Sequence, residues 1–153
     1  MKGSAPEVVG YKKPADEIAG VAQWLKQILN QGYKPRDIAL FARTDGTLRD
    51  RVEPALEKAS LSAHSLTDEL PPSTAHASVG TMHRAKGLEF KVVVIMGCDA
   101  DQVPWKYALK DMVDNSDKET FEEQERNLLY VAGTRARERL LFTYSGRPSK
   151  FLP

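Results

Sequence analysis

The stretch FKVVVIMG, residues 90–97, decides the fold that the sequence predicts. It is a short, unbroken apolar run, rich in Val and ended by Gly, which is typical of a strand buried on both faces of a parallel sheet. Directly before it, TMHRAKGLEF, residues 81–90, gathers Thr, His, Arg, Lys, Gly and Glu. A buried strand does not need these polar groups for packing, so they indicate a ligand site next to the start of the strand.

Outward from this strand, segments of strand and helix character alternate along the chain. In residues 14–32, for example, Ile18, Val21, Leu25 and Ile28 recur at helical spacing, and Gly32 follows as a stop. We expect strands at 6–12, 37–43, 61–66, 77–82, 90–97 and 137–146, helices at 14–32, 45–60 and 118–136, a loop at 67–76 and an irregular connection at 99–117. The alternation predicts an α/β domain with a mainly parallel sheet flanked by helices. Ligands of such sheets bind at the carboxyl ends of strands.

The composition is that of an ordinary globular domain. The 153 residues are 41% hydrophobic and 28% charged, and the net charge of +1 gives no global signature of a polyanion-binding protein. No apolar run approaches the roughly 20 residues of a membrane span, and the first residues do not resemble a signal peptide. Cys98 is the one cysteine, so no internal disulfide or multi-cysteine zinc site is expected, and we interpret it as a small packed thiol. A cytoplasmic location is expected.

The charges are unevenly distributed near the C-terminus. Residues 111–125 hold seven acids and one lysine, whereas residues 126–150 hold six basic residues and one acid, Glu138. The basic stretch is either a surface for phosphates or a solvated helix face, and charge alone does not decide between them.

Several kinds of catalytic site are missing from the sequence. No glycine-rich loop with Lys and Ser or Thr occurs, no G-x-G-x-x-G occurs, and the Asp-Glu pairs at 16–17 and 68–69 do not follow an apolar strand. His64, His76 and His83 are scattered, so no metal site is expected. What remains resembles half of a site, with Arg and Lys that can stabilise a phosphoryl group held by another domain.

Two motifs carry a resemblance to a known family. Residues 79–97 resemble motif V of the UvrD/Rep/PcrA family of superfamily 1 DNA helicases, and residues 122–139 resemble its motif VI. Residues 36–60 resemble the region of motif IVa, and residues 147–153 resemble the end of the second motor domain. The motor of this family has two RecA-like domains, with ATP between them and single-stranded DNA across both.

The resemblance implies that residues 1–153 are a single C-terminal motor domain, RecA-like but lacking its own P-loop. Its partners would be single-stranded DNA and an N-terminal RecA-like domain of the same parent, which would hold most of the ATP and Mg²⁺. The chain departs from the family in two respects. Motif IV is absent, and the interval between the motif IVa region and motif V is too short for the large helical 2B insertion of UvrD and Rep.

The resemblance also assigns roles to individual residues. Arg135 matches the catalytic arginine that reaches the γ-phosphate, and Glu89 the residue that binds the ribose. The complete set is Arg135, Glu89 and Gly87 for ATP, Thr81, His83 and Lys86 for DNA, and Arg43, Glu123 and Arg126 for support, with no metal ligand. Gly87 supplies a backbone angle that other residues resist. Arg43 would face either the DNA or solvent, and Tyr130 is expected to be packed.

Two rival interpretations remain open at this point. The chain could be a binding or regulatory module that keeps the fold without motor activity. It could also be a nuclease built on the E-x-K pattern of Glu89 and Lys91 with Asp68 upstream, although metal nucleases need their carboxylates on adjacent strands. In either case the isolated chain is expected to have no ATPase activity, because it lacks a phosphate cradle.

Overall fold

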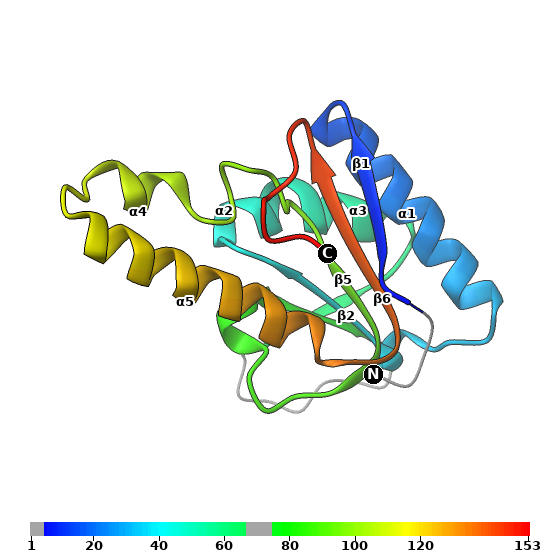
Figure 1. The fold of residues 1–153 in the computed structure, drawn as a ribbon. Coiled ribbons are helices and arrows are strands. Elements are labelled where there is room, and N and C mark those ends of the chain that lie inside the picture. The colour runs from blue at the N-terminus through cyan, green and yellow to red at the C-terminus, as the bar shows by residue number, and fades with distance from the viewer. Residues whose placement is uncertain (1–4, 67–74) are drawn as a thin grey trace.

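The computed structural model describes residues 5–66 and 75–153, which form a six-stranded sheet between two layers of helices (Figure 1). The elements follow in the order β1 Glu7–Tyr11, α1 Pro14–Asn30, η1 Pro35–Asp37, β2 Ile38–Ala42, α2 Asp45–Thr47, η2 Leu48–Val52, α3 Glu53–Lys58, β3 Ala63–Ser65, β4 Ala77–Thr81, η3 Met82–Arg84, β5 Phe90–Ile95, α4 Lys106–Lys110, α5 Asn115–Gly133 and β6 Ala136–Ser145. No helix among the described residues combines the length and apolar character that crossing a membrane requires.

All pairings between these strands are parallel, in the order β1-β6-β5-β2-β4-β3. The α/β class and the parallel sheet expected from the sequence are therefore confirmed. The central strands are buried on both faces, as the apolar run predicted: β2 is buried throughout, and Val92 to Ile95 of β5 are fully buried.

Alternation along the strands builds one core on each face of the sheet. Leu40, Val94 and Leu141 pack with α1 and α3 on one face. Phe41 and Phe142 pack with η3 and α5 on the other face. Figure 1 shows α5 on the opposite side of the sheet from α3. Cys98 is fully buried, and burial raises the pKa of its thiol well above the ordinary value, so it is the packed thiol expected from the sequence.

The helical segments differ from the prediction in three places. The helix expected at 45–60 contains a π-helical turn, η2, just before Pro54, which lacks the N–H that a regular α-helical ladder needs. The connection expected to be irregular contains α4. The last helix begins earlier than predicted, because the side chain of Asp114 caps it by accepting a hydrogen bond of 2.8 Å from the backbone N–H of Ser116.

A buried charge cluster ties α1 to the carboxyl ends of β5 and β6. Glu17, with no exposed surface, accepts hydrogen bonds from Arg51 Nη1 at 2.9 Å, the N–H of Gly97 at 2.9 Å and the hydroxyl of Thr143 at 2.7 Å. Arg51 also forms a two-point ion pair with Asp99, whose Oδ1 accepts the N–H of Ser145. Each carboxylate has several donors, which is the condition for burying such a group at acceptable cost.

Candidate nucleotide and DNA interfaces

Arg135 and Glu89, both expected at the nucleotide, lie together at the amino ends of β6 and β5. Arg135 follows the end of α5 and precedes β6 directly. Its backbone oxygen accepts the N–H of Phe90 at 2.9 Å, and its Nη1 donates to the backbone oxygen of Leu88 at 3.2 Å. Arg135 therefore contacts the residues on both sides of Glu89, which is itself exposed.

Hydrogen bonds fix the side chain of Arg135 but occupy only some of its guanidinium N–H groups. Its Nε donates to the backbone oxygen of Val131 at 3.2 Å, and its Nη2 donates to the hydroxyl of Thr134 at 3.1 Å. With the bond to Leu88, three of the five guanidinium N–H groups have partners in the described part of the chain. The remaining two are free to bind a further acceptor.

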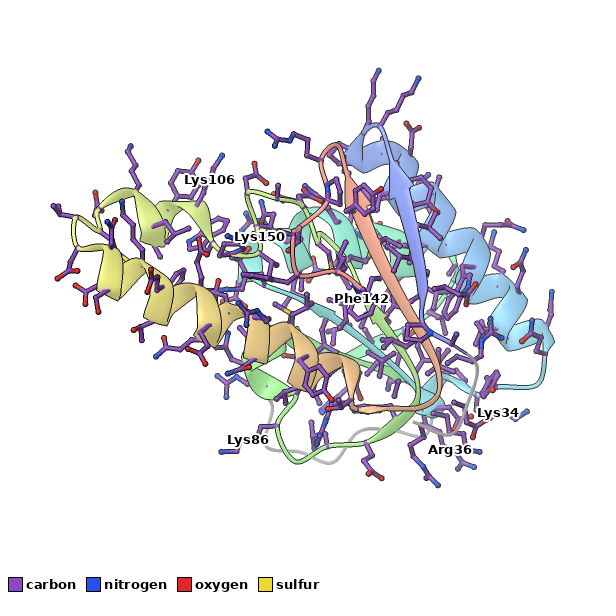
Figure 2. The ribbon with its side chains drawn as sticks, viewed as in Figure 1. Lys34, Arg36, Lys86, Lys106, Phe142 and Lys150 are labelled. Carbon is purple, nitrogen blue, oxygen red and sulfur yellow. The ribbon has the colours of Figure 1, made fainter. Side chains whose placement is uncertain are left out.

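Gly87 and Lys86 lie in the turn that precedes Glu89. Gly87 has φ of +80°, a conformation that side-chain-bearing residues rarely adopt, which agrees with the conformational role expected for it. Both residues are exposed, and Figure 2 shows Lys86 pointing outward from this turn.

Thr81 and His83, both expected at the DNA, lie at the opposite end of the strands, where β4 finishes. Thr81 is the last residue of β4, and the exposed His83 belongs to η3, which follows directly. The connection of residues 82–89 then returns to the amino end of β5, and β2 lies between β4 and β5 in the sheet. The polar stretch found in the sequence therefore runs from the carboxyl ends of the strands to their amino ends.

Arg43, which the sequence left facing either DNA or solvent, instead forms a largely buried ion pair. Its Nε donates to both carboxylate oxygens of Glu125, at 2.8 and 3.1 Å, and Glu125 is only 3% exposed. Glu125 Oε1 also accepts the backbone N–H of Trp105 at 2.9 Å. Arg43 thus connects the end of β2 to α5 and to the loop after β5.

The other two residues expected in a supporting role, Glu123 and Arg126, are exposed on α5. The guanidinium of Arg126 lies 5.4 Å from the ring centroid of Phe151. Sequence reasoning missed Glu125, although its spacing from Leu129 and Ala132 places it on the apolar face of α5. A carboxylate on such a face is the signal that would have identified it.

The surroundings of His83 lower the pKa of its imidazole below 6.5, first through burial and then through the nearby charges of Arg43 and Arg84, against an opposing effect of Glu125. This environment therefore favours the neutral form of the His83 imidazole. The unfolded chain binds this proton more readily, so the contribution of His83 to stability falls as the pH drops below 6.5.

We expect an NMR titration to place the pKa of His83 below 6.5, and Arg84→Gln to raise it because a neighbouring cation is removed. Bound single-stranded DNA should raise it too, since phosphates favour the imidazolium. His83→Gln assigns the resonance. A pKa at or above 6.5 in the free chain would contradict the environment described here.

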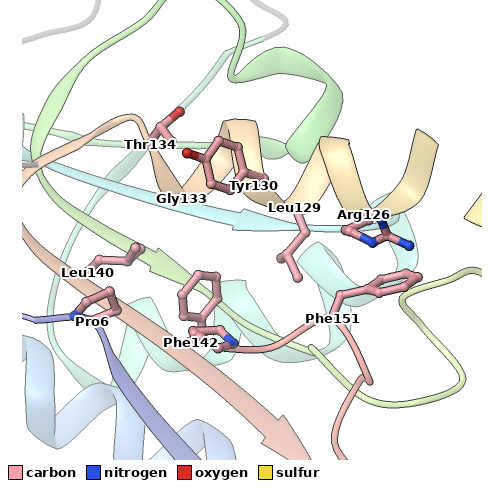
Figure 3. A pocket seen from close by; sticks show the side chains of 10 residues that line it. Pro6, Arg126, Leu129, Tyr130, Gly133, Thr134, Leu140, Phe142 and Phe151 are labelled. Atoms are coloured by element: carbon pink, nitrogen blue, oxygen red, sulfur yellow. The ribbon is translucent and has the colours of Figure 1, made fainter. Parts of the chain in front are cut away.

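An apolar pocket of about 410 Å³ lies between α5, β6 and the C-terminal tail (Figure 3). Leu129, Phe142 and Phe151 line its wall, with Arg126 at one end. Tyr130 also lines it and is 71% exposed, so the expectation that Tyr130 is packed was wrong. Gly133 closes α5 where a Cβ atom would lie 3.2 Å from the ring of Phe142, which explains the lack of a larger side chain.

Comparisons with known proteins show the family of this chain. The family model for the UvrD-like helicase C-terminal domain matches residues 47–147. The chain belongs to this family.

Individual relatives support the same conclusion. The ATP-dependent DNA helicase Rep of Buchnera aphidicola is 32% identical over 135 residues, which are 87% of this chain and 18% of Rep. The ATP-dependent DNA helicase PcrA of Staphylococcus aureus is 42% identical over 79 residues, which are 48% of this chain and 10% of PcrA. The chain thus spans less than a fifth of the length of these relatives.

A solved structure shows the same fold. It is the C-terminal domain of a possible DNA helicase from Lactobacillus plantarum, with a TM-score of 0.70 and 19% sequence identity, and the match covers 97% of this chain and 79% of the other. The RecA-like α/β fold implied by the resemblance is therefore confirmed. The nuclease interpretation depends on Asp68, which lies outside the described residues.

Proposed function

We propose that this chain is the second motor domain of an ATP-dependent DNA helicase or translocase. It would complete the ATP site of an N-terminal motor domain and contact single-stranded DNA. The observation that carries the proposal is that Arg135 bonds to the residues on both sides of Glu89, at the amino ends of β5 and β6, in a chain with no phosphate-binding loop of its own.

On the nucleotide side, Arg135 supplies positive charge to a phosphoryl group held by the other domain. A guanidinium is always charged, and its planar fork matches phosphate oxygens. The hydrogen bonds to Leu88 and Val131 fix the direction of the side chain and leave two N–H groups for the phosphate. Glu89 is assigned to the ribose hydroxyls, and Mg²⁺ and most of the ATP contacts belong to the N-terminal domain.

On the DNA side, Thr81 and His83 are assigned to the strand, and Lys86 to its phosphates. The hydroxyl and the neutral imidazole bond or stack without adding charge, whereas Lys86 supplies a charge. Because residues 82–89 run from these groups to Glu89, a shift of this connection on nucleotide binding would move the DNA contacts as well.

The isolated chain is expected to hydrolyse no ATP and to bind single-stranded DNA weakly. With few phosphate contacts, its affinity for an oligo(dT) strand should fall about tenfold between 50 and 200 mM salt. Lys86→Ala should reduce the log–log salt slope by about 0.7. Lys26→Ala, an exposed lysine of α1 on the other side of the sheet, is the control and should leave the slope unchanged.

The decisive experiment uses the open reading frame that encodes the whole parent protein. ATP turnover stimulated by single-stranded DNA would support the motor. Turnover by the isolated chain would contradict the shared site. A parent with no nucleotide-binding domain would leave the rival function, a binding or regulatory module that reuses the fold.

A further inference from the structure

An exposed aromatic and basic cluster occupies α4 and the residue before it. Tyr107 is 56% exposed, and its ring meets Trp105 edge to face, with ring centroids 5.0 Å apart at an angle of 64°. The ammonium of Lys106 lies 4.9 Å from the centroid of the same ring. Lys110 follows one helical turn after Lys106. None of these four residues has a role in the proposed motor site.

Hydrogen bonds to the rest of the domain hold the backbone that carries this cluster. The backbone N–H of Trp105 donates to the buried carboxylate of Glu125 at 2.9 Å, and Glu125 is held in turn by Arg43. Two residues earlier, Val103 is 1% exposed and its backbone oxygen accepts the hydroxyl of Ser149. An aromatic ring presented on a fixed backbone loses little conformational entropy when a ligand binds to it.

The cluster adjoins the proposed DNA contacts. Glu125 joins Trp105 to Arg43, and Arg43 and Glu125 are both near enough to His83 to act on its pKa. Arg43 follows the carboxyl end of β2, and His83 follows that of β4. Figure 1 shows α4 beside the first half of α5, and Figure 2 shows Lys106 pointing away from the domain there. A chain of contacts thus leads from Tyr107 through Trp105 and Glu125 to Arg43, whose charge acts on His83.

The charges of the two lysines are not equivalent. Lys106 forms an exposed ion pair of 3.4 Å with Asp101, which neutralises much of its charge. Lys110 forms no ion pair with any of the described residues, although the acid-rich residues 111–125 follow it directly. An exposed ring with an unpaired cation one turn away matches the alternation of base and phosphate in a single strand.

We propose that Tyr107 stacks on a base of single-stranded DNA while Lys110 contacts a neighbouring phosphate, so that α4 extends the DNA interface beyond Thr81 and His83. This inference rests on the proposed function, because it assigns the strand a longer path over the same domain. Trp105 supports the ring of Tyr107 from the side and reports on its environment.

The test measures binding of the 153-residue chain to fluorescently labelled oligo(dT) of about 16 nucleotides at low salt. Tyr107→Ala should weaken binding about tenfold, Tyr107→Phe should retain it because the ring remains, and Lys110→Ala should lower the log–log salt slope by about 0.7. Since Trp24 and Trp105 are the two tryptophans, Trp24→Phe leaves Trp105 as the one reporter, and its fluorescence should be quenched by the strand.

Matched variants separate this inference from the function on which it rests. Tyr130→Ala removes an even more exposed tyrosine, which lines the pocket at the other end of α5, and it should bind like the wild type. Weakening by Lys86→Ala but not by Tyr107→Ala would overturn the α4 contact and leave the proposed function intact. Equal weakening by Tyr130→Ala would also overturn it. No binding by the wild-type chain would overturn both the α4 contact and the proposed DNA contacts.

Discussion

Arg135→Ala is expected to lower the ATP turnover of the parent protein by about 10³-fold while ATP still binds. The missing guanidinium would have stabilised charge on the transferring phosphoryl group, a contribution that reaches 10³-fold or more in related phosphoryl-transfer sites. Arg135→Lys should recover little of the loss, because an ammonium cannot reproduce the planar fork that is directed by the bonds to Leu88 and Val131. Single-turnover hydrolysis and nucleotide binding, measured separately, check both parts.

The control for this experiment is Arg137→Ala, which removes an exposed arginine two residues further along β6. It should keep nearly normal turnover. Thermal melting of each variant is needed as well, because Arg135→Ala also removes hydrogen bonds that join the end of α5 to the turn before β5. Turnover that does not respond to Arg135→Ala in a folded protein would remove the arginine from the proposed mechanism.

Glu17→Ala is expected to be the most destabilising single change in the buried charge cluster, at about 3–5 kcal/mol of unfolding free energy. It leaves the N–H of Gly97 and the hydroxyl of Thr143 without their acceptor and removes one of the two carboxylates that face Arg51. For a domain of this size the melting temperature should fall by about 10 °C or more.

Glu57→Ala is the matched control, since Glu57 is an exposed glutamate of α3 with no ion pair among the described residues. It should change the unfolding free energy by less than about 0.5 kcal/mol. Glu17→Gln should lie between the two, because an amide keeps one acceptor oxygen for the donors. A melting temperature for Glu17→Ala equal to that of Glu57→Ala would show that the cluster adds no net stability.

The sequence predicted the elements of the fold better than the charged groups in its interior. The apolar run of β5 can be recognised from the sequence alone, because burial on both faces requires four consecutive apolar residues, Val92 to Ile95. The burial of Glu17 has no comparable signal in the sequence. An acid in the first turn of a helix is expected to be solvated there, and only the arrival of Arg51 from a distant segment explains its burial.

The site was predicted unevenly for the same reason. The resemblance to motifs V and VI assigned Glu89 and Arg135 to the nucleotide, and these roles stay predictions. It could not show that Arg135 bonds to the residues on both sides of Glu89, since its contact with Leu88 depends on the pairing of β5 with β6. The partner of Arg43 was also missed, because Glu125 lies far from it along the chain and comes near only when α5 packs against the sheet.

The place of β1 in the sheet has a consequence for how the polypeptide folds as it is made. β1 pairs only with β6 among the described strands, Glu7 opposite Leu141, so β1 leaves the ribosome well before the strand with which it pairs. At typical rates of synthesis the delay over on the order of a hundred residues lasts on the order of ten seconds. During that time Val8 and Val9 have no neighbouring strand, and chaperones that hold extended apolar segments would find β1 open to them.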